Sequence, residues 1–201
     1  MEVPKAVWLF DCQAGINVEA AVVVLSRESV KYLCHDWVEP NWWTETPLPD
    51  EAREEPDYDW DWVALLSQDQ HKPGRFAVGL QTPDGRLQGA LVYRVGVNSA
   101  LEPAKKAIFV DRIASAPANR EYLVEAPRFR GVGEALLRYA VAESWFYTFG
   151  GCVNLFPIAN VDFYLKRKFK PTATFDPKTG DILYELSSAD AESWLRECGV
   201  L

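Results

Sequence analysis

A glycine-rich turn directly in front of an amphipathic helix constrains this chain more than any other feature. Residues 128–133 read Arg-Phe-Arg-Gly-Val-Gly, and the amphipathic run 134–145 follows at once. The first turn of a helix has backbone N–H groups without intrahelical acceptors, and the helix dipole adds partial positive charge there. Glycine lets the backbone approach a ligand closely, and Arg128 and Arg130 add cationic charge. The pattern therefore predicts a phosphate-binding turn.

Length and composition predict a single domain. The chain has 201 residues, of which 48% are hydrophobic, enough for a sizeable core. No apolar run reaches the ~18 residues of a membrane span, and the N-terminal residues do not read as a signal peptide. The four cysteines lack CxxC spacing, which indicates buried thiols in a reducing compartment and no metal site. We therefore expect a cytoplasmic protein that binds neither a membrane nor a metal.

The net charge of −8 lies entirely in the first half of the chain. Residues 1–100 carry 16 acids and 8 bases, whereas residues 101–201 carry 13 of each. Nine of the acids lie in the proline-rich segment 39–61, together with Trp42, Trp43 and Trp60. An acidic surface repels nucleic acid, so we expect no nucleic-acid partner. Acids with tryptophans suit a cationic amine, although a solvated acidic loop would read the same way.

The order of the expected elements is mixed α/β with antiparallel hairpins. Asn17 is expected to cap a helix over 18–32, and a short helix is expected over 59–70. Pro83-Asp84-Gly85 marks a hairpin turn, and Ser188 is a candidate cap for a closing helix. The other expected elements are strands over 6–12, 75–82, 87–95, 106–115, 152–156, 172–175 and 182–186, and helices over 134–147, 160–168 and 189–198.

Three motifs in this order resemble the GNAT acetyltransferase superfamily. Residues 128–133 match that family's Q/R-x-x-G-x-G/A loop, and the strand over 109–117 is similar to the one that precedes it. Residues 160–169, Asn-Val-Asp-Phe-Tyr-Leu-Lys-Arg-Lys-Phe, are similar to its N-x-x-x-Y-x-K-x-G-F run. The resemblance implies a mostly antiparallel central sheet with a splayed strand pair, flanked by helices. It covers residues 75–186, the expected cofactor-binding core, with 1–74 on the acceptor side and 187–201 as the closing helix.

The resemblance implies acetyl-CoA as the acyl donor and assigns residues to it. The loop, with Arg128, would bind the diphosphate through the N–H groups of Arg130, Gly131, Val132 and Gly133. The backbone of Ile113, Ala114 and Ser115 would pair with the pantetheine arm as an added strand does, and Asn160 would both cap its helix and touch that arm. Tyr164 would protonate the departing thiolate.

The sequence leaves the general base and the acceptor open. Asp111 on the third central strand is the candidate base, unless it faces solvent or pairs with Arg112; acids of 39–61 are an alternative. The acceptor is expected to be a small cationic amine, or else a protein N-terminus or lysine. A non-catalytic CoA-binding module is a further possibility, and the chain could be a monomer or a homodimer. Two departures from the family pattern are the ten-residue insertion 118–127 and Lys168 in place of the usual glycine.

Overall fold

The computed structural model describes residues 2–26, 60, 62, 73–158 and 160–199. Contacts between residues divide the chain into two compact units. Unit 1 comprises Met1–Val3, Tyr93–Asp111 and Leu137–Leu201, and unit 2 comprises Pro4–Val92 and Arg112–Leu136. The acidic segment 39–61 and the helix expected over 59–70 lie outside the described residues, apart from Trp60 and Trp62.

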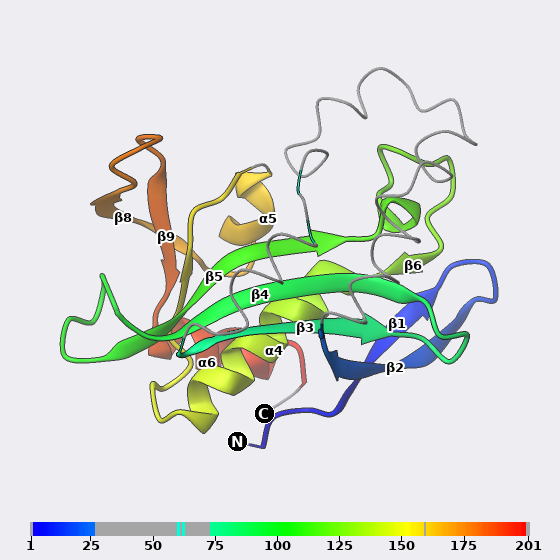
Figure 1. Ribbon diagram of the computed structural model, residues 1–201, viewed down its shortest axis with the longest axis horizontal. Coiled ribbons are helices and arrows are strands. Elements are labelled where there is room, and N and C mark those ends of the chain that lie inside the picture. Colours follow the sequence, from blue (N-terminus) through cyan, green and yellow to red (C-terminus); the bar gives the residue numbers. More distant parts are fainter. Residues whose placement is uncertain (1, 27–59, 61, 63–72, 159, 200–201) are drawn as a thin grey trace. The chain divides into compact units, whose positions relative to one another are not determined.

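The described residues form a mixed α/β fold with a mostly antiparallel sheet (Figure 1). Hydrogen-bonded neighbours follow the order β6-β1-β2-β3-β4-β5-β7-β9-β8, and β5 pairs with β7 in parallel. The strands are β1 Ala6–Asp11, β2 Ile16–Val24, β3 Arg75–Gln81, β4 Leu87–Asn98, β5 Lys106–Ser115, β6 Phe129–Arg130, β7 Val153–Leu155, β8 Lys170–Phe175 and β9 Ile182–Leu186. The helices are η3 Pro117–Asn119, α4 Val132–Phe146, α5 Val161–Leu165 and α6 Ser188–Glu197.

The helix expected over 18–32 is wrong, because residues 16–24 form strand β2. Its β-branched run, Val22 to Val24, favours extended backbone, and β2 pairs with β1 so that Leu9 lies opposite Val18. The turn between the two strands is fixed by Asp11, whose carboxylate accepts from the N–H groups of Gln13 and Ala14. Pairing with β1 therefore overrides the local capping signal of Asn17.

The expected hairpin around Pro83-Asp84-Gly85 is confirmed in unit 2. The Thr82 N–H donates to the Arg86 carbonyl oxygen at 3.0 Å, and Gly85 adopts φ +82° in the turn. One face of this unit holds a hydrophobic cluster of Leu25, Trp62, Leu87, Ala90, Val92, Ala114 and Ala116. The Trp60 ring packs edge-on against Trp62. These apolar contacts therefore hold the N-terminal part of β4 together with the C-terminal end of β5.

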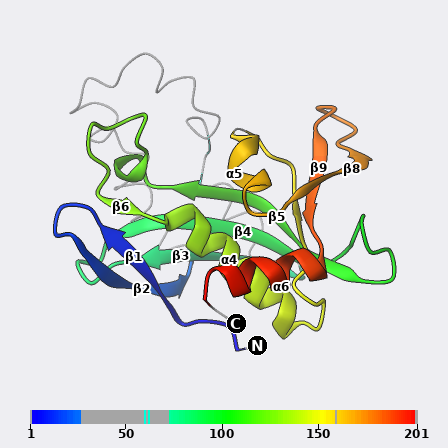
Figure 2. The same cartoon turned by 180° about the vertical axis from the view of Figure 1, so that it is seen from behind.

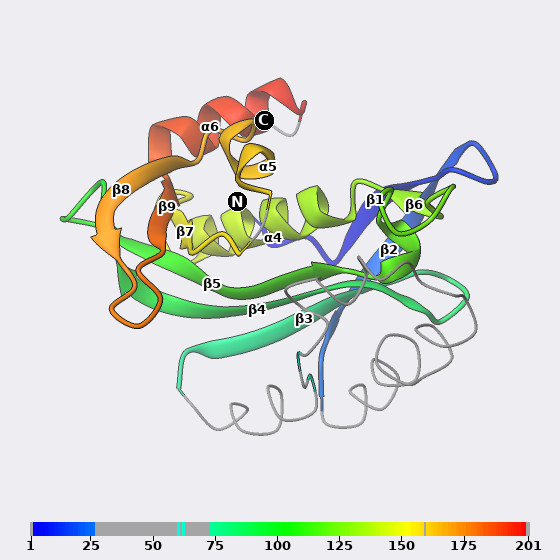
Figure 3. The same ribbon diagram turned by 90° about the horizontal axis from the view of Figure 1, so that it is seen from above.

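In unit 1, β7 connects β5 to the C-terminal hairpin. It pairs with β5 over Ile108–Val110 and with β9 over Tyr184–Leu186. Figures 2 and 3 show α6 and the C-terminal part of α4 on the same side of β5. The cap of α6 is Ser187, whose hydroxyl accepts from the Asp190 N–H, and not Ser188 as expected. Among the described residues, no helix has the length and apolar character needed to cross a membrane.

Candidate functional site

The glycine turn begins as a short strand. Arg130 of β6 stands opposite Phe10 of β1, and the Cys12 N–H donates to the Arg128 carbonyl oxygen at 2.8 Å. Hydrogen-bonded pairs alternate along an antiparallel ladder, so the next such pair after Cys12 and Arg128 is Phe10 and Arg130. The Arg130 N–H therefore faces β1. Of the four amides expected to bind phosphate, those of Gly131, Val132 and Gly133 come after this ladder.

Gly131 is the residue at which the turn becomes helix α4. It has φ +86°, and its carbonyl oxygen accepts the Ala135 N–H at 2.8 Å, which closes the first helical turn. In the described part of the chain, no protein acceptor meets the N–H groups of Gly131, Val132 or Gly133. A Cβ atom added to Gly131 would find nothing within 4 Å. The turn therefore offers unbonded donors beside open space, which is the chemistry of an anion site.

A glycine in β4 sets the position of this turn. A Cβ atom at Gly89 would lie 2.5 Å from Val132 Cγ1, 3.0 Å from Leu136 Cδ1 and 3.2 Å from the Ala114 carbonyl oxygen. Val132 and Leu136 are 3% and 0% exposed, so the first turns of α4 are pressed onto β4 at this glycine. Sequence reasoning missed Gly89; its signal was a lone glycine inside an apolar strand, which often marks a close backbone approach.

Asn119 of η3, in the insertion 118–127, connects the glycine turn 128–133 to β4 through hydrogen bonds. The Asn119 side-chain amide donates to the carbonyl oxygen of Gln88 at 3.2 Å and to its Oε1 at 3.0 Å. Its Oδ1 accepts the Phe129 N–H at 2.9 Å. The Gln88 Nε2 donates in turn to Thr82 Oγ1 at 2.9 Å, in a buried position. Residues 117–129 are therefore tied to the sheet by a continuous hydrogen-bond network.

The two loop arginines both have carboxylate partners. Arg128 Nη2 lies 2.9 Å from Asp84 Oδ2, and the Arg128 guanidinium lies over the Phe129 ring. Burial raises the pKa of Asp84, but hydrogen bonds from Thr82 and the Arg86 N–H, with the charge of Arg128, outweigh it and lower that pKa. Arg130 Nε lies 3.0 Å from Glu121 Oε1, and both of these side chains are more than half exposed.

Along strand β5, the residues whose N–H and C=O groups point toward β4 change from odd-numbered to even-numbered. The Lys105 carbonyl oxygen accepts from the Ser99 N–H, whereas the Ile108 N–H donates to Cys152 just before β7. Odd-numbered residues thus face β4 at this end and even-numbered ones face β7. Beyond the strand's other end, the Ala116 N–H donates to the Gln88 carbonyl oxygen of β4. The phase is reversed, which places a β-bulge between Ile108 and Ala116.

This change decides which of the three residues expected to bind pantetheine have backbone groups that face away from β4. The Ala114 carbonyl oxygen lies 3.2 Å from a Cβ atom built at Gly89 of β4, so the N–H and C=O of Ala114 face β4, as the Ala116 N–H does. Those of Ile113 and Ser115 therefore face away from β4. The Ser115 carbonyl oxygen already accepts from Arg120 Nε at 3.0 Å and Nη2 at 2.8 Å. The groups presented for pairing are therefore those of Ile113 and the Ser115 N–H. Sequence reasoning gave no hint of the Arg120 contact.

The parallel ladder of β5 and β7 is short. It covers Ile108–Val110 on β5 and Val153–Leu155 on β7, where β7 ends. Strand β5 continues for five more residues to Ser115. The splayed strand pair implied by the family resemblance stays a prediction.

Tyr164 of α5 is a buried phenol among aromatic rings. Its side chain is 9% exposed and packs edge-on against Phe163 and Phe169, with ring centroids 5.1 and 5.8 Å away. Burial raises the pKa of Tyr164 to about 12, against a smaller opposing effect of Arg167. The phenol is therefore protonated at neutral pH and can donate a hydrogen bond.

Asn160 and Lys168 flank α5 in left-handed backbone conformations. Asn160 stands at the N-cap position with φ 51°, but its side chain makes no capping hydrogen bond, so its expected capping role is wrong. Its exposed amide stays available to a ligand. Lys168, where the family usually has glycine, adopts φ 67°. Its Nζ donates to Ser193 Oγ at 2.8 Å and lies 2.6 Å from Glu197 Oε1, which ties the turn to α6.

Asp111, the candidate base, is ion-paired in unit 1. The Arg94 Nε lies 3.1 and 3.2 Å from the two carboxylate oxygens of Asp111, and the Arg94 guanidinium lies over the Phe109 ring. The sequence offered Arg112 as a partner for Asp111. In unit 2, Arg112 lies over the Trp60 ring, 4.9 Å from its centroid. Trp60 thus already contacts a cation of its own chain.

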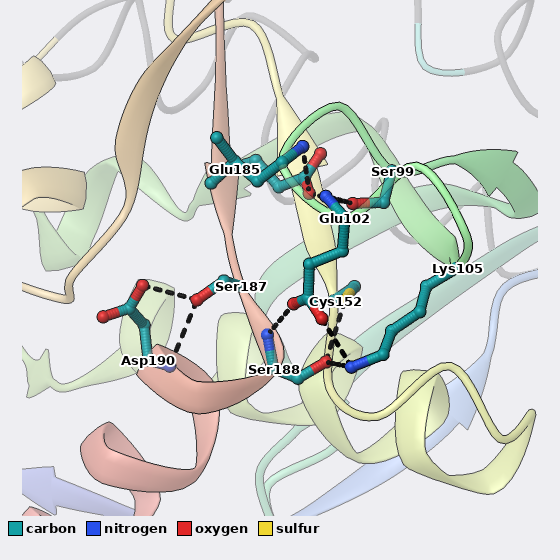
Figure 4. Close-up of polar contacts among 9 residues, drawn as sticks. Ser99, Glu102, Lys105, Cys152, Glu185, Ser187, Ser188 and Asp190 are labelled. Atoms are coloured by element: carbon teal, nitrogen blue, oxygen red, sulfur yellow. Dashed lines mark hydrogen bonds and ion pairs between the residues drawn. The ribbon is translucent and has the colours of Figure 1, made fainter.

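A second polar cluster, in unit 1, joins the 99–105 loop to the start of α6 (Figure 4). Glu102 Oε1 accepts the Ser188 N–H at 2.6 Å, and Lys105 Nζ donates to Ser188 Oγ at 2.8 Å. The hydrogen bond to Glu102 raises the pKa of Lys105, and burial raises the pKa of the Cys152 thiol. A protonated lysine cannot activate Ser188, and a neutral buried thiol is a poor nucleophile. This cluster is therefore structural.

Comparisons with known proteins place this geometry in a class of folds. No family model and no curated protein matches the sequence. Solved structures do match, among them the GNAT domain of S. lividans PAT, with 15% identity over 90% of this chain and 96% of that chain and a TM-score of 0.56. Another is an acetyltransferase of the GNAT family from Staphylococcus aureus MU50, with 11% identity over 84% of this chain and 99% of that chain and a TM-score of 0.54. A GNAT-family acetyltransferase from Listeria monocytogenes 4b F2365 matches with 17% identity over 84% and 95% and a TM-score of 0.52. The chain therefore has the GNAT acetyltransferase fold.

Proposed function

We propose that this chain is an N-acyltransferase that uses acetyl-CoA as donor and a primary amine as acceptor. The observation that carries the proposal is the turn at Gly131 within a GNAT fold, where the N–H groups of Gly131, Val132 and Gly133 have no acceptor among the described residues and a Cβ atom at Gly131 would meet nothing within 4 Å. A diphosphate is the ligand group that such a turn suits best. Acetyl-CoA supplies an activated acyl group as a thioester.

The described residues fit acetyl-CoA with two changes to the expected set, at Arg130 and at Ala114. The N–H groups of Gly131, Val132 and Gly133 would bind the diphosphate, without the Arg130 N–H, which faces β1. The outward N–H and C=O of Ile113 and the Ser115 N–H would pair with the pantetheine amides, whereas Ala114 faces β4. The amide of Asn160 is a further candidate contact for that arm.

In the reaction, the amine nitrogen attacks the thioester carbonyl carbon, the C–S bond breaks, and the sulfur needs a proton. Tyr164 holds such a proton on its phenol. A thiol has a reference pKa of about 8.5, so complete transfer from a phenol of pKa about 12 is uphill by about 3 to 4 pK units. Tyr164 would therefore act mainly by donating a hydrogen bond to the departing thiolate, with the final proton reaching the sulfur from water.

The amine must lose a proton for the products to be neutral. Asp111 is our candidate base; each of its oxygens accepts from Arg94 Nε, and a carboxylate oxygen has a further lone pair that can take that proton. The acceptor we propose is a small cationic amine. The excess of eight acids in residues 1–100 supports this choice, because it would draw cations toward the chain.

Binding is tested first, by thermal unfolding with and without acetyl-CoA. Acetyl-CoA at ~100 times its Kd should stabilise the fold by ~2.7 kcal/mol. Gly131→Glu should abolish this shift, because it places a carboxylate at the anion site. Gly180→Glu is the matched control, since Gly180 in the β8–β9 turn has φ +79° and equally open surroundings. No shift in the wild type, or equal shifts in both variants, would contradict the proposal.

Turnover is tested by release of free thiol from acetyl-CoA across a panel of amines. We expect release with small diamines or aminated sugars and little with anionic amines. Thiol release only with peptide amines would show that the acceptor is a protein amine. Binding of acetyl-CoA without thiol release on any amine would show that the chain is a CoA-binding module and not an enzyme.

A further inference from the structure

The two arginines of the phosphate loop are held in different ways. Arg128 is about one-third exposed, its partner Asp84 is fixed by Thr82 and the Arg86 N–H, and its guanidinium lies on the Phe129 ring. Arg130 is 61% exposed and its partner Glu121 is 66% exposed. Arg128 is therefore part of the scaffold, whereas the pair of Arg130 and Glu121 is a surface pair that exchanges easily with other ions.

We propose that Arg130 is the ligand-binding cation of the loop and that Glu121 is a built-in competitor for the ligand's phosphate. This inference rests on the proposed function and names a specificity-determining pair within the same site. Arg130 directly precedes Gly131, the cap of α4, so its long side chain can reach an anion at the first helical turn. Glu121 belongs to the 118–127 insertion.

The competition follows from the chemistry of the two partners. A single carboxylate on an exposed arginine gains little in water. A phosphate carries more charge, accepts two parallel hydrogen bonds from a guanidinium, and would also be held by the adjacent N–H groups. Phosphate should therefore displace Glu121, at the cost of breaking the pair. The loop then discriminates modestly between ligands by charge, because a weakly charged ligand gains less than phosphate does when it replaces the carboxylate.

The test is the Kd of CoA and of dephospho-CoA, measured by calorimetry at low and at moderate salt. Glu121→Gln should tighten CoA binding about threefold, because the competitor loses its charge. Arg130→Gln should weaken it about tenfold and reduce its salt dependence. Glu125→Gln is the matched control, since Glu125 is an exposed acid of the same insertion and the variant changes the net charge equally. It should leave the Kd unchanged.

The decisive measurement is the double variant. With Arg130→Gln already present, Glu121→Gln should give no further gain, because the two residues act through one contact. Equal effects of Glu121→Gln and Glu125→Gln, or additive effects with Arg130→Gln, would overturn this inference while CoA binding itself stands. A wild-type chain that binds no CoA would overturn both this inference and the proposed function. Thermal unfolding of each variant serves to check that the variant is folded.

Discussion

Replacing Gly89 with alanine should displace the glycine turn through its packing contact with Val132. The added Cβ atom would lie 2.5 Å from Val132 Cγ1, 3.0 Å from Leu136 Cδ1 and 3.2 Å from the Ala114 carbonyl oxygen. Val132 is β-branched and stiff at χ1, and the carbonyl belongs to β5, so neither can move aside cheaply. The first turns of α4 must therefore shift away from β4. Overpacking of this kind costs about 2 kcal/mol, or about 4 to 8 °C in Tm for a chain of this size.

Gly79→Ala is the matched control for Gly89→Ala. It adds the same methyl to the neighbouring strand, where the close atoms are the terminal methyls Leu87 Cδ2 and Leu25 Cδ2 at 2.8 and 2.9 Å. These side-chain ends can rotate, so the loss of stability should be smaller. Thermal unfolding and CoA calorimetry on both variants should show weaker CoA binding for Gly89→Ala alone. Equal Tm and equal CoA affinity in the two variants would refute the packing argument.

Substitutions at three other residues give distinct outcomes. Tyr164→Phe keeps the ring contacts and should slow thiol release more than it weakens acetyl-CoA binding; unchanged steady-state turnover would remove Tyr164 from the mechanism. Lys168→Gly should be more stable than Lys168→Ala by about 1 kcal/mol in urea unfolding, because both lose the α6 contact but only alanine strains at φ 67°; the reverse order would contradict this. Burial raises the pKa of Glu102, but hydrogen bonds from Lys105 and Ser188 outweigh this effect and lower that pKa from 4.5 to about 2. The ionised carboxylate therefore stabilises the folded state above pH 4.5, and this stabilisation is lost as the pH falls toward 2. Glu102→Gln should therefore cost about 1 to 3 kcal/mol at pH 7 and almost nothing near pH 2; an equal cost at both would exclude this linkage.

Local sequence signals predicted the elements that they determine by themselves. Strand β5 has the expected bounds, 106–115, and the Pro83-Asp84-Gly85 turn forms its hairpin because its residues favour that turn wherever they occur. Strand β2 was mistaken for a helix because the capping signal of Asn17 was given more weight than the β-branched run Val22 to Val24, whose extended conformation is fixed by pairing with β1. The closing helix was predicted correctly, with its cap displaced by one residue.

The details of the candidate site depend on contacts between distant residues, which a sequence pattern does not carry. The β-bulge in β5 has no glycine or proline to mark it. It nevertheless decides that the backbone N–H and C=O groups of Ile113 and Ser115, and not those of Ala114, face away from β4. The contacts of Asn119 with Gln88 and of Arg120 with Ser115 arise from the insertion, which has no counterpart in the motif. The position of the glycine turn was predictable, because the amphipathic run that follows it indicates the start of a helix, which is α4.

We propose that the amides at the start of α4 bind the diphosphate of CoA, and NMR of the backbone N–H resonances of Val132 and Gly133 during titration with CoA can decide this. Both resonances should move early and saturate with the same Kd that calorimetry gives. Saturable CoA binding that leaves both resonances in place would contradict the proposal.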